Sequence, residues 1–404
     1  MSLLSAYAEV IGPEAVHTLE RLAAPLRGRS FLHVNSTAAG GGVAEILTQL
    51  VPIFRELGLD CRWEVIAGTP EFFDVTKTFH NALQGEATGL ADAQYDLYRR
   101  VNEDNARRLD LSADYVFIHD PQPAALIASR KGGKWCWRCH IDASHPHPAV
   151  WEFLRPYVES YDAAVFSMAS YSQVLPILQF RIPPAIDPFS QKNRDLSDRE
   201  IERALKKYAV PRDKPIILQV SRFDRFKDPL GVIAAYRMVK PYADCRLVLA
   251  GGTAADDPEG ALVLAQVREA AAEDPNIHVL AMPQDDLAIN ALQRAAAIVL
   301  QKSTREGFGL TVSEALWKKK PVIAGAVGGL PLQVIEGATG YLVHSPEGAA
   351  FRIRSLLKRP ALARRMGQRG RDHVRLHFLL SRQARDYLFL LHAMDRPEET
   401  IIRL

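Results

Sequence analysis

The sequence is poor in cysteine and has no long apolar run. Its four cysteines are Cys61, Cys136, Cys139 and Cys245. They are too few and too scattered for a disulfide framework, so we expect reduced thiols. No window of about eighteen apolar residues is free of charge, as a membrane-spanning helix would require. The first residues, MSLLSAYAEVIGPE, lack the basic start and apolar stretch of a signal peptide. We therefore expect a cytoplasmic protein with no membrane partner.

A large excess of charge of one sign is also missing. Lys and Arg total 50 and Asp and Glu total 47, which gives a formal net charge of +3. A dedicated nucleic-acid-binding protein usually carries a strong basic stripe, so we expect no nucleic-acid partner. Hydrophobic residues make up 48% of the chain and charged residues 24%, as in a folded globular protein. A length of 404 residues predicts two or three domains. The sequence does not decide between a monomer and a homodimer.

Apolar, β-type segments alternate with helical patterns along the chain. The predicted strands are 29–36, 114–120, 135–142, 161–168, 215–224, 245–252, 276–283, 296–303 and 321–329. Strands and helices that alternate at this spacing form parallel sheets with helices on both faces.

The alternation is interrupted at 181–193, RIPPAIDPFSQKN, where three prolines cannot continue a helix or a central strand. We therefore predict an α/β protein with two Rossmann-like lobes facing a central cleft. The lobes are expected to comprise residues 1–187 and 188–380. Ligands of open parallel sheets bind beyond the carboxyl ends of the strands, so the residues that follow each strand are the candidates for a site.

Gly40–Gly42 lead from the first predicted strand into a helix. Glycines allow a close backbone approach, and a helix N-terminus presents amides to an anion. The segment is not a GxGxxG motif, and a tight turn that binds nothing explains it equally well.

Two cations follow the strand at 215–224, in the segment SRFDRFK. Arg222 as a fork and Lys227 as a point charge could neutralise a diphosphate without a metal. The alternative is an ordinary solvated loop.

The segment REGFGLTVSEA, residues 305–315, is the most informative. Glu306 lies on a predicted loop, the turn at Gly307-Phe308-Gly309 can present amides to an anion or to sugar hydroxyls, and a helix begins near Leu310. Glu314, in the first turn of that helix, could hold two vicinal hydroxyls. Alternatively, Thr311 to Glu314 is a capping box. Both carboxylates belong to one strand-loop-helix segment, whereas a glycoside hydrolase needs them on opposite sides of the bond.

The segment KWCWRCHIDASHPH, residues 134–147, suggests a metal site or a redox site. It has no second CxxC and no spaced histidine pair to complete a zinc site. A redox CxxC begins a helix, but this one lies in a predicted strand. Strand alternation places His140 at the carboxyl end, beside the cleft, and makes the cysteines packing residues. Asp142 either binds a ligand or caps the following turn.

Lys77 and His80 lie in FFDVTKTFHNALQG, residues 72–85. Polar groups among aromatic residues suit a sugar site. An amphipathic surface helix is the alternative.

Three of these segments together resemble the retaining nucleotide-sugar glycosyltransferases of the GT-B fold. They are GGGVAE at 40–45, SRFDRFK at 221–227 and REGFGLTVSEA at 305–315, with Glu306 and Glu314 as the two acids of an E-x7-E element. Further segments are similar to the trehalose glycosyltransferring synthases, and retaining trehalose phosphorylases share much of this pattern. These segments are HVNSTAAGGGVAEIL at 33–47, FFDVTKTFHNALQG at 72–85, VFIHDPQPAAL at 116–126, WRCHID at 137–142 and PPAIDP at 183–188.

The resemblance implies a reversible transfer of glucose from UDP-, ADP- or GDP-glucose to free glucose, which gives α,α-trehalose. It also implies that the C-terminal segment 381–404 packs back on the first lobe. No cofactor and no metal are expected, because preorganised cations can stabilise the departing diphosphate. Phosphorolysis of trehalose, transfer to another acceptor such as a sugar phosphate, and sugar-nucleotide binding without catalysis stay open as alternatives.

The resemblance also assigns residues to the donor. Arg222 and Lys227 would bind the diphosphate, together with the amides of Gly41 and Gly42. Glu314 would hold the ribose hydroxyls. Glu306 and the backbone of Gly307, Phe308, Gly309 and Leu310 would hold the glucose hydroxyls.

On the acceptor side, the resemblance places His140 over the sugar near the reacting carbon. Asp120, at the end of VFIHD, would bind the acceptor glucose. Lys77, His80 and Asp142 are expected to contribute to the same acceptor site.

Overall fold

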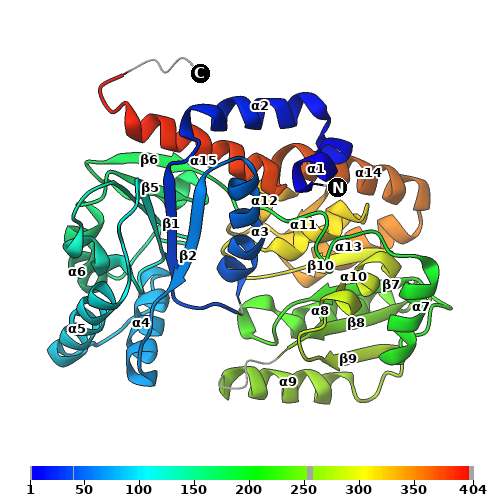
Figure 1. The fold of residues 1–404 in the computed structure, drawn as a ribbon. Coiled ribbons are helices and arrows are strands. Elements are labelled where there is room, and N and C mark those ends of the chain that lie inside the picture. The colour runs from blue at the N-terminus through cyan, green and yellow to red at the C-terminus, as the bar shows by residue number, and fades with distance from the viewer. Residues whose placement is uncertain (1, 40, 253–257, 400–404) are drawn as a thin grey trace. The chain divides into compact units, whose positions relative to one another are not determined.

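The computed structural model describes residues 2–39, 41–252 and 258–399, which form two compact units (Figure 1). Unit 1 comprises Met1–Ala185 with Leu380–Leu404, and unit 2 comprises Ile186–Leu379. The boundary between the two units follows Ala185, whereas the boundary predicted from the sequence follows residue 187. Each unit is a parallel sheet flanked by helices, which confirms the predicted α/β fold class.

Unit 1 contains a six-stranded sheet in the order β2-β1-β3-β4-β5-β6. Its strands are β1 (Ser30–Asn35), β2 (Asp60–Val65), β3 (Tyr115–His119), β4 (Lys134–Arg138), β5 (Ala163–Phe166) and β6 (Leu178–Arg181). The edge strands β2 and β6 were not predicted. They are only partly buried, so they lack the continuous apolar runs of the central strands.

Helices and short 3-10 turns surround this sheet. The helices are α1 (Leu3–Ile11), α2 (Pro13–Ala23), α3 (Gly42–Glu56), α4 (Pro70–Leu83), α5 (Asp92–Arg108), α6 (Pro148–Val158) and α15 (Leu380–Asp395). The 3-10 turns are η1 (Ala24–Leu26), η2 (Ala124–Ser129) and η3 (Ala169–Tyr171). Large aromatic side chains, among them Trp135, Trp137 and Tyr98, fill the core.

The C-terminal helix belongs to unit 1. α15 packs on α2 and α3, and α2 and α15 lie side by side in Figure 1. The His392 ring lies 2.8 Å from the Leu22 carbonyl oxygen, and Arg382 donates to the Pro183 carbonyl at 2.8 Å. These contacts connect residues far apart in the sequence and attach the end of the chain to its beginning.

Unit 2 contains the second six-stranded parallel sheet, in the order β12-β11-β10-β7-β8-β9. Its strands are β7 (Ile216–Val220), β8 (Arg246–Gly251), β9 (Ile277–Ala281), β10 (Ile298–Gln301), β11 (Val322–Gly325) and β12 (Gly340–Val343). β12 was not predicted, because four residues beside glycines give too short a pattern. β7 and β10 are neighbours, with Ile298 opposite Ile217, so the loops that follow them emerge together.

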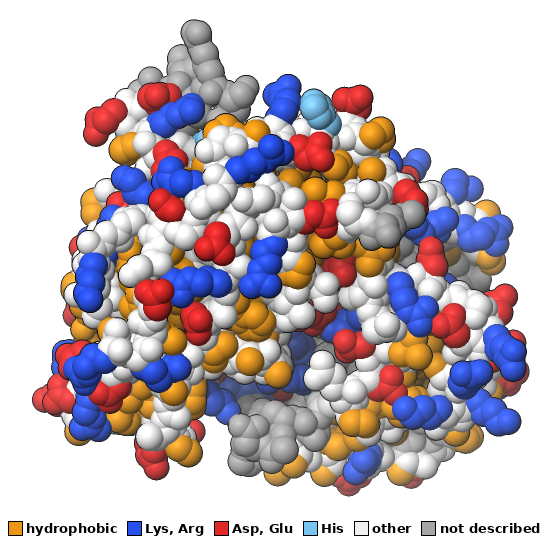
Figure 2. Space-filling model, in the orientation of Figure 1, with side chains coloured by type: hydrophobic (Ala, Val, Ile, Leu, Met, Phe, Trp, Pro, Cys, Tyr) orange, Lys and Arg blue, Asp and Glu red, His pale blue; other side chains and the backbone are white. Residues whose placement is uncertain are grey.

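The helices of unit 2 are α7 (Asp198–Lys207), α8 (Pro229–Val239), α9 (Pro258–Ala271), α10 (Asp286–Ala295), α11 (Leu310–Trp317), α12 (Leu330–Gln333), α13 (Pro346–Leu357) and α14 (Pro360–His377), with the 3-10 turn η4 (Arg225–Lys227). In this unit, α8 to α12 connect successive strands, α7 precedes the first strand, and α13 and α14 follow the last. No helix in the described ranges is long and apolar enough to cross a membrane. On the face drawn in Figure 2, basic and acidic side chains are interspersed, as the small net charge suggests.

The packing of α15 predicts a stability difference between two neighbouring residues. Leu391 is fully buried, whereas Phe389 on the same helix is exposed. We expect Leu391→Ala to lower the free energy of unfolding by about 2–5 kcal/mol, because it leaves a cavity. Phe389→Ala should change it by about 0.5 kcal/mol or less. Denaturant unfolding followed by tryptophan fluorescence measures both, and equal losses would show that α15 is not packed as described.

Candidate active site

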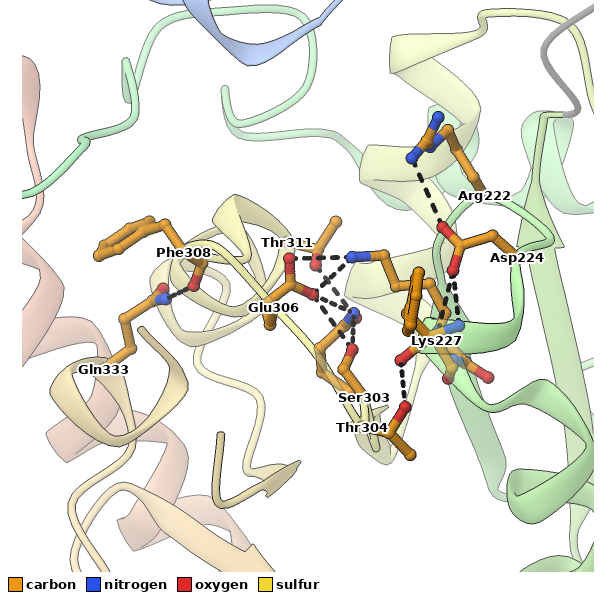
Figure 3. A network of polar contacts seen from close by, with 12 residues as sticks. Arg222, Asp224, Lys227, Ser303, Thr304, Glu306, Phe308, Thr311 and Gln333 are labelled. Carbon is orange, nitrogen blue, oxygen red and sulfur yellow. Dashed lines mark hydrogen bonds and ion pairs between the residues drawn. The ribbon is translucent and has the colours of Figure 1, made fainter. Parts of the chain in front are cut away.

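Two neighbouring strands of unit 2 end at the candidate donor site. The loop after β7 carries Arg222 and Lys227, and the loop after β10 carries Glu306. Lys227 Nζ donates to Glu306 Oε1 at 2.9 Å and to Oε2 at 2.8 Å, and Figure 3 shows the two side chains pointing toward one another. The side chains are 18% and 9% exposed, so this ion pair is largely removed from water. The structure thus joins two residues that lie 79 positions apart in the sequence.

Polar neighbours from β10 hold the Glu306 carboxylate in place. Gln301 Nε2 and Ser303 Oγ each donate to Glu306 Oε2 at 3.1 Å. Thr311 Oγ1 donates in turn to Gln301 Oε1 at 3.2 Å, which connects the network to α11. Sequence reasoning missed Gln301 and Ser303. Polar residues at the end of an otherwise apolar strand were the signal that could have identified them.

The loop that carries Lys227 is fixed at both ends by aspartates. Asp224 Oδ1 accepts from the backbone amides of Phe226 and Lys227, at 2.8 and 3.2 Å. Asp228 has a left-handed backbone (φ 47°) and caps α8 through the Gly231 amide at 3.0 Å. Its carboxylate also forms a close ion pair with Lys302, just after β10. The position of Lys227 is therefore set by the backbone of its loop.

Arg222 is the more open of the two cations. Its side chain is 64% exposed, and Figure 3 shows its contact with Asp224, from Nη2 to Oδ2 at 3.5 Å. A guanidinium held this loosely keeps donors for a phosphate, since it has five N–H groups. The structure therefore places the predicted Arg222 and Lys227 pair on one loop.

The turn from Glu306 into α11 depends on one glycine. Gly309 has φ 78° and precedes the first helical residue, Leu310. A Cβ at Gly309 would lie 2.8 Å from Leu330 Cδ2 and 3.2 Å from Glu306 Cγ, so a larger residue would displace the carboxylate. Gln333 Nε2 donates to the carbonyl of Phe308 and fixes the turn from the other side.

The capping-box alternative for Glu314 is wrong. α11 begins after Gly309 and has no side-chain cap, so Glu314 lies in the second turn and not in the first. Its buried carboxylate accepts from Gln293 Nε2 at 3.4 Å and lies 3.9 Å from Lys192 Nζ. The helix begins at Leu310, as predicted, with the left-handed Gly309 as its N-cap, so Glu314 is the fifth helical residue and lies too far along to cap the helix start.

In unit 1, the ends of β3 and β4 bring Asp120 and His140 together. Asp120 Oδ1 accepts from the His140 backbone amide at 2.7 Å, and the Asp120 amide donates to the Arg138 carbonyl at 2.8 Å. The Asp120 backbone is left-handed (φ 64°), a conformation that aspartate tolerates better than most residues. Burial raises the pKa of Asp120 to about 7, against the opposing effects of the His140 amide and Arg138.

His140 also contacts a histidine that sequence reasoning missed. Its Nε2 lies 3.0 Å from Nδ1 of His119, the last residue of β3. His119 in turn lies 3.0 Å from His33 in β1. Both residues stand in segments singled out by their patterns, HVNS and VFIHD, but a strand pattern does not show which strands are adjacent.

Gly41 and Gly42 form the start of α3. Gly41 is its N-cap, with φ 84° and no side-chain hydrogen bond to the first turn. A Cβ at Gly41 would meet no atom within 4 Å, so the amides of this turn are approachable. Gly40 lies outside the described residues.

The other predicted acceptor residues are Lys77, His80 and Asp142. Lys77 is exposed and His80 half-buried on α4, and no hydrogen bond or ion pair in the described ranges links Lys77 to Asp120, Asp142 or His140. Asp142 Oδ1 accepts from the amide and the hydroxyl of Ser144, at 3.0 and 2.7 Å. This is the capping arrangement that the sequence left open beside acceptor binding.

The cysteines near His140 are buried free thiols. Burial raises the pKa of both Cys136 and Cys139, which disfavours the reactive thiolate. Within the described part of the chain, no three His, Cys, Asp or Glu side chains gather in a way that could hold a metal ion.

The sequence matches two family models. Residues 33–173 match "Trehalose synthase, N-terminal domain", and residues 200–373 match "Glycosyl transferases group 1". A trehalose synthase of Pyrococcus horikoshii is 46% identical over 401 residues, which span 97% of this chain and 96% of that protein. A trehalose phosphorylase of Pleurotus pulmonarius is 29% identical over 454 residues, which span 98% of this chain but 61% of that protein.

A solved structure shares the fold. A UDP-forming α,α-trehalose-phosphate synthase from Burkholderia xenovorans superimposes with a TM-score of 0.73, over 91% of this chain and 99% of that chain. The identity is 16%, so this likeness concerns the fold alone.

The Lys227–Glu306 pair predicts strong coupling between two substitutions. Either Lys227→Met or Glu306→Gln leaves one partly buried charge without its partner, which is costly, whereas the double variant removes both charges. We expect a coupling energy of about 1–3 kcal/mol in a double-mutant cycle of unfolding free energies.

The ion pair of Lys214 and Asp244, whose aspartate is 76% exposed, provides the control. Its coupling should stay below about 1 kcal/mol. Additive effects for Lys227 and Glu306 would contradict the described pair.

The raised pKa of Asp120 predicts a pH dependence. The folded protein holds the Asp120 proton up to about pH 7, whereas an unfolded aspartate loses it near pH 4, so this residue costs stability as the pH rises between these values. Asp120→Asn keeps an acceptor for the His140 amide and removes that cost. We expect its unfolding free energy relative to wild type to increase from pH 4 to pH 7 and then level off. A difference that is constant across this range would exclude the raised pKa.

Proposed function

The chain belongs to the trehalose synthase family of GT-B glycosyltransferases, and we propose that it forms α,α-trehalose reversibly from a nucleoside-diphosphate glucose and free glucose, with retention at the anomeric carbon. The observation that carries this proposal is the contact of Lys227 with both oxygens of Glu306 at the ends of β7 and β10. In this proposal the cation would bind a phosphate and the adjacent carboxylate would bind sugar hydroxyls.

The donor diphosphate would bind to Arg222 and Lys227. An ammonium has three N–H groups, so Lys227 can contact both Glu306 oxygens and still donate to a phosphate oxygen. The exposed guanidinium of Arg222 would add a fork of donors. As the bond to the leaving group breaks, negative charge grows on the diphosphate, and fixed cations stabilise it without a metal. The uncapped amides at Gly41 and Gly42 would bind the same group.

The sugar and the nucleoside would bind beside these cations. Glu306 and the backbone from Gly307 to Leu310 would hold the glucose hydroxyls, since the carboxylate is already oriented by Gln301 and Ser303. Glu314 would hold the ribose, and its contacts with Gln293 and Lys192 keep the carboxylate buried and oriented.

Asp120 and His140 would form the acceptor side. The hydrogen bond from the His140 amide fixes the Asp120 side chain beside His140, whose ring is held by His119. The acceptor hydroxyl would attack the anomeric carbon from the face that the diphosphate leaves. The bond from carbon to the acceptor oxygen forms, the bond to the phosphate oxygen breaks, and that phosphate oxygen takes the hydroxyl proton.

A donor-dependence assay tests the proposal. The purified protein is incubated with glucose and UDP-, ADP- or GDP-glucose in turn, and products are followed by proton NMR. We expect α,α-trehalose and an equal amount of nucleoside diphosphate with at least one donor.

Trehalose phosphorylase is the second candidate, because the Pleurotus pulmonarius relative aligns with nearly the whole chain. Glucose 1-phosphate from trehalose and phosphate, with no activity on any sugar nucleotide, would identify it. The identity to trehalose synthases is greater, at 46%, and supports trehalose synthesis as the first candidate.

The assignment of the diphosphate site predicts unequal effects of two arginines. Arg222→Ala should lower kcat/KM about a hundredfold, the usual effect of removing one stabilising donor. Arg225→Ala, on the same loop, is the matched control, because this exposed arginine stacks on Phe226 with its guanidinium 4.7 Å from the ring centre. We expect it to retain near wild-type kcat/KM. Equal kinetics for both variants would refute the role of Arg222.

A further inference from the structure

Three histidines from neighbouring strands form a hydrogen-bonded row in unit 1. His33 lies in β1, His119 ends β3, and His140 follows β4, and these strands are adjacent in the sheet. His33 Nδ1 is 3.0 Å from His119 Nε2, and His119 Nδ1 is 3.0 Å from His140 Nε2. His33 and His119 are buried, and only His140, at the end of the row, is partly exposed.

The surroundings keep all three rings neutral. Burial lowers the pKa of His33 to about 3. Burial is also the main cause of the lowered pKa of His119, and the other two rings and Arg138 lower it further. The pKa of His140 is lowered as well, mainly by burial, then by the charge of Arg138 and by His33. Arg138 is itself fully buried, so its charge acts on the row through a medium that screens it weakly.

A row of neutral rings has only two arrangements of protons. A neutral imidazole carries one proton, so His119 must donate to one neighbour and accept from the other. If it donates to His140, all three rings carry the proton on Nδ1. If it donates to His33, all three carry it on Nε2. The tautomer of His140 is therefore fixed by the two buried histidines.

The buried end of the row distinguishes the two arrangements. His33 Nε2 has no hydrogen-bond partner within the described residues. The His33 ring packs against Phe31, Phe54 and Tyr387, with ring centres 4.3 to 6.3 Å away. The second arrangement would leave an N–H group there without an acceptor, and orphaned buried N–H groups are the rarer defect in proteins. The first leaves only a lone pair.

We propose that His33 and His119 are positioning residues, which hold His140 as the Nδ1–H tautomer so that it donates a hydrogen bond to a substrate oxygen. This role at the substrate rests on the proposed function. With Nε2 occupied by His119 and Nδ1 already protonated, His140 cannot accept the proton of the attacking hydroxyl. That proton instead passes to the leaving phosphate oxygen, as in the same-face attack proposed above.

Nitrogen NMR of the full chain, labelled with ¹⁵N-histidine, tests the tautomer without any substrate. His33→Phe, His119→Phe and His140→Phe assign the three rings by loss of their signals. We expect a protonated Nδ1 and a bare Nε2 in all three. Protonation of His140 on Nε2, an imidazolium, or a mixture of tautomers at His140 would each overturn the proposal. A protein that made no trehalose would still give this result, so the test separates the row from the proposed function.

Kinetics of two variants at His119 test the positioning role. Phenylalanine keeps the ring shape but loses both hydrogen bonds, whereas the asparagine amide can place an N–H group near the position of Nδ1. We expect His119→Phe to lower kcat about tenfold with little change in KM for the donor, the contribution of one lost hydrogen bond in a dry site. His119→Asn should recover most of that loss.

The control is His392→Phe, which removes another buried histidine of unit 1 outside the row. It should leave kcat unchanged. Thermal unfolding of each variant separates loss of fold from loss of position. A folded His119→Phe with wild-type kcat, or a folded His119→Asn as impaired as His119→Phe, would contradict the positioning role.

Discussion

The ion pair between Lys227 and Glu306 is the interaction on which the candidate donor site depends. Lys227 comes from the loop after β7 and Glu306 from the loop after β10, and the pair joins these loops at the carboxyl edge of the sheet. Asp224 and Asp228 fix the first loop, while Gln301, Ser303 and the turn at Gly309 fix the second. Contacts within the protein thus hold both loops, and such preorganisation is what makes fixed charges effective in catalysis.

In unit 1, as in unit 2, the candidate site lies where neighbouring parallel strands end. Adjacent parallel strands end at the same edge, so β1, β3 and β4 bring His33, His119, Asp120 and His140 together although they are far apart in sequence. Here the side chains are buried and largely neutral, whereas the unit 2 site is charged. This difference suits the chemistry proposed for each, a neutral hydroxyl acceptor in one unit and a diphosphate in the other.

Much of this could be predicted from the sequence, because central strands of parallel sheets are continuous apolar runs and sites follow their ends. That reasoning proposed Arg222, Lys227, Glu306, Asp120 and His140 as site residues, and the structure brings Lys227 to Glu306 and Asp120 to His140. The same reasoning missed β2, β6 and β12, whose exposure or short length weakens the pattern. It placed the start of α11 near Leu310 correctly but assigned Glu314 to the first turn, whereas this residue lies in the second. The partners Gln301, Ser303, His33 and His119 depend on strand order, which a single strand does not encode.

The central claim is that side-chain cations, and not a metal, hold the donor diphosphate. Isothermal titration calorimetry of the full chain with UDP, ADP and GDP, each in Mg²⁺ and in excess EDTA, tests it most directly. The account predicts that at least one diphosphate binds with the same affinity in both conditions, because Arg222 and Lys227 supply the positive charge. Binding that appears only with Mg²⁺, or no binding of any of the three, would contradict it.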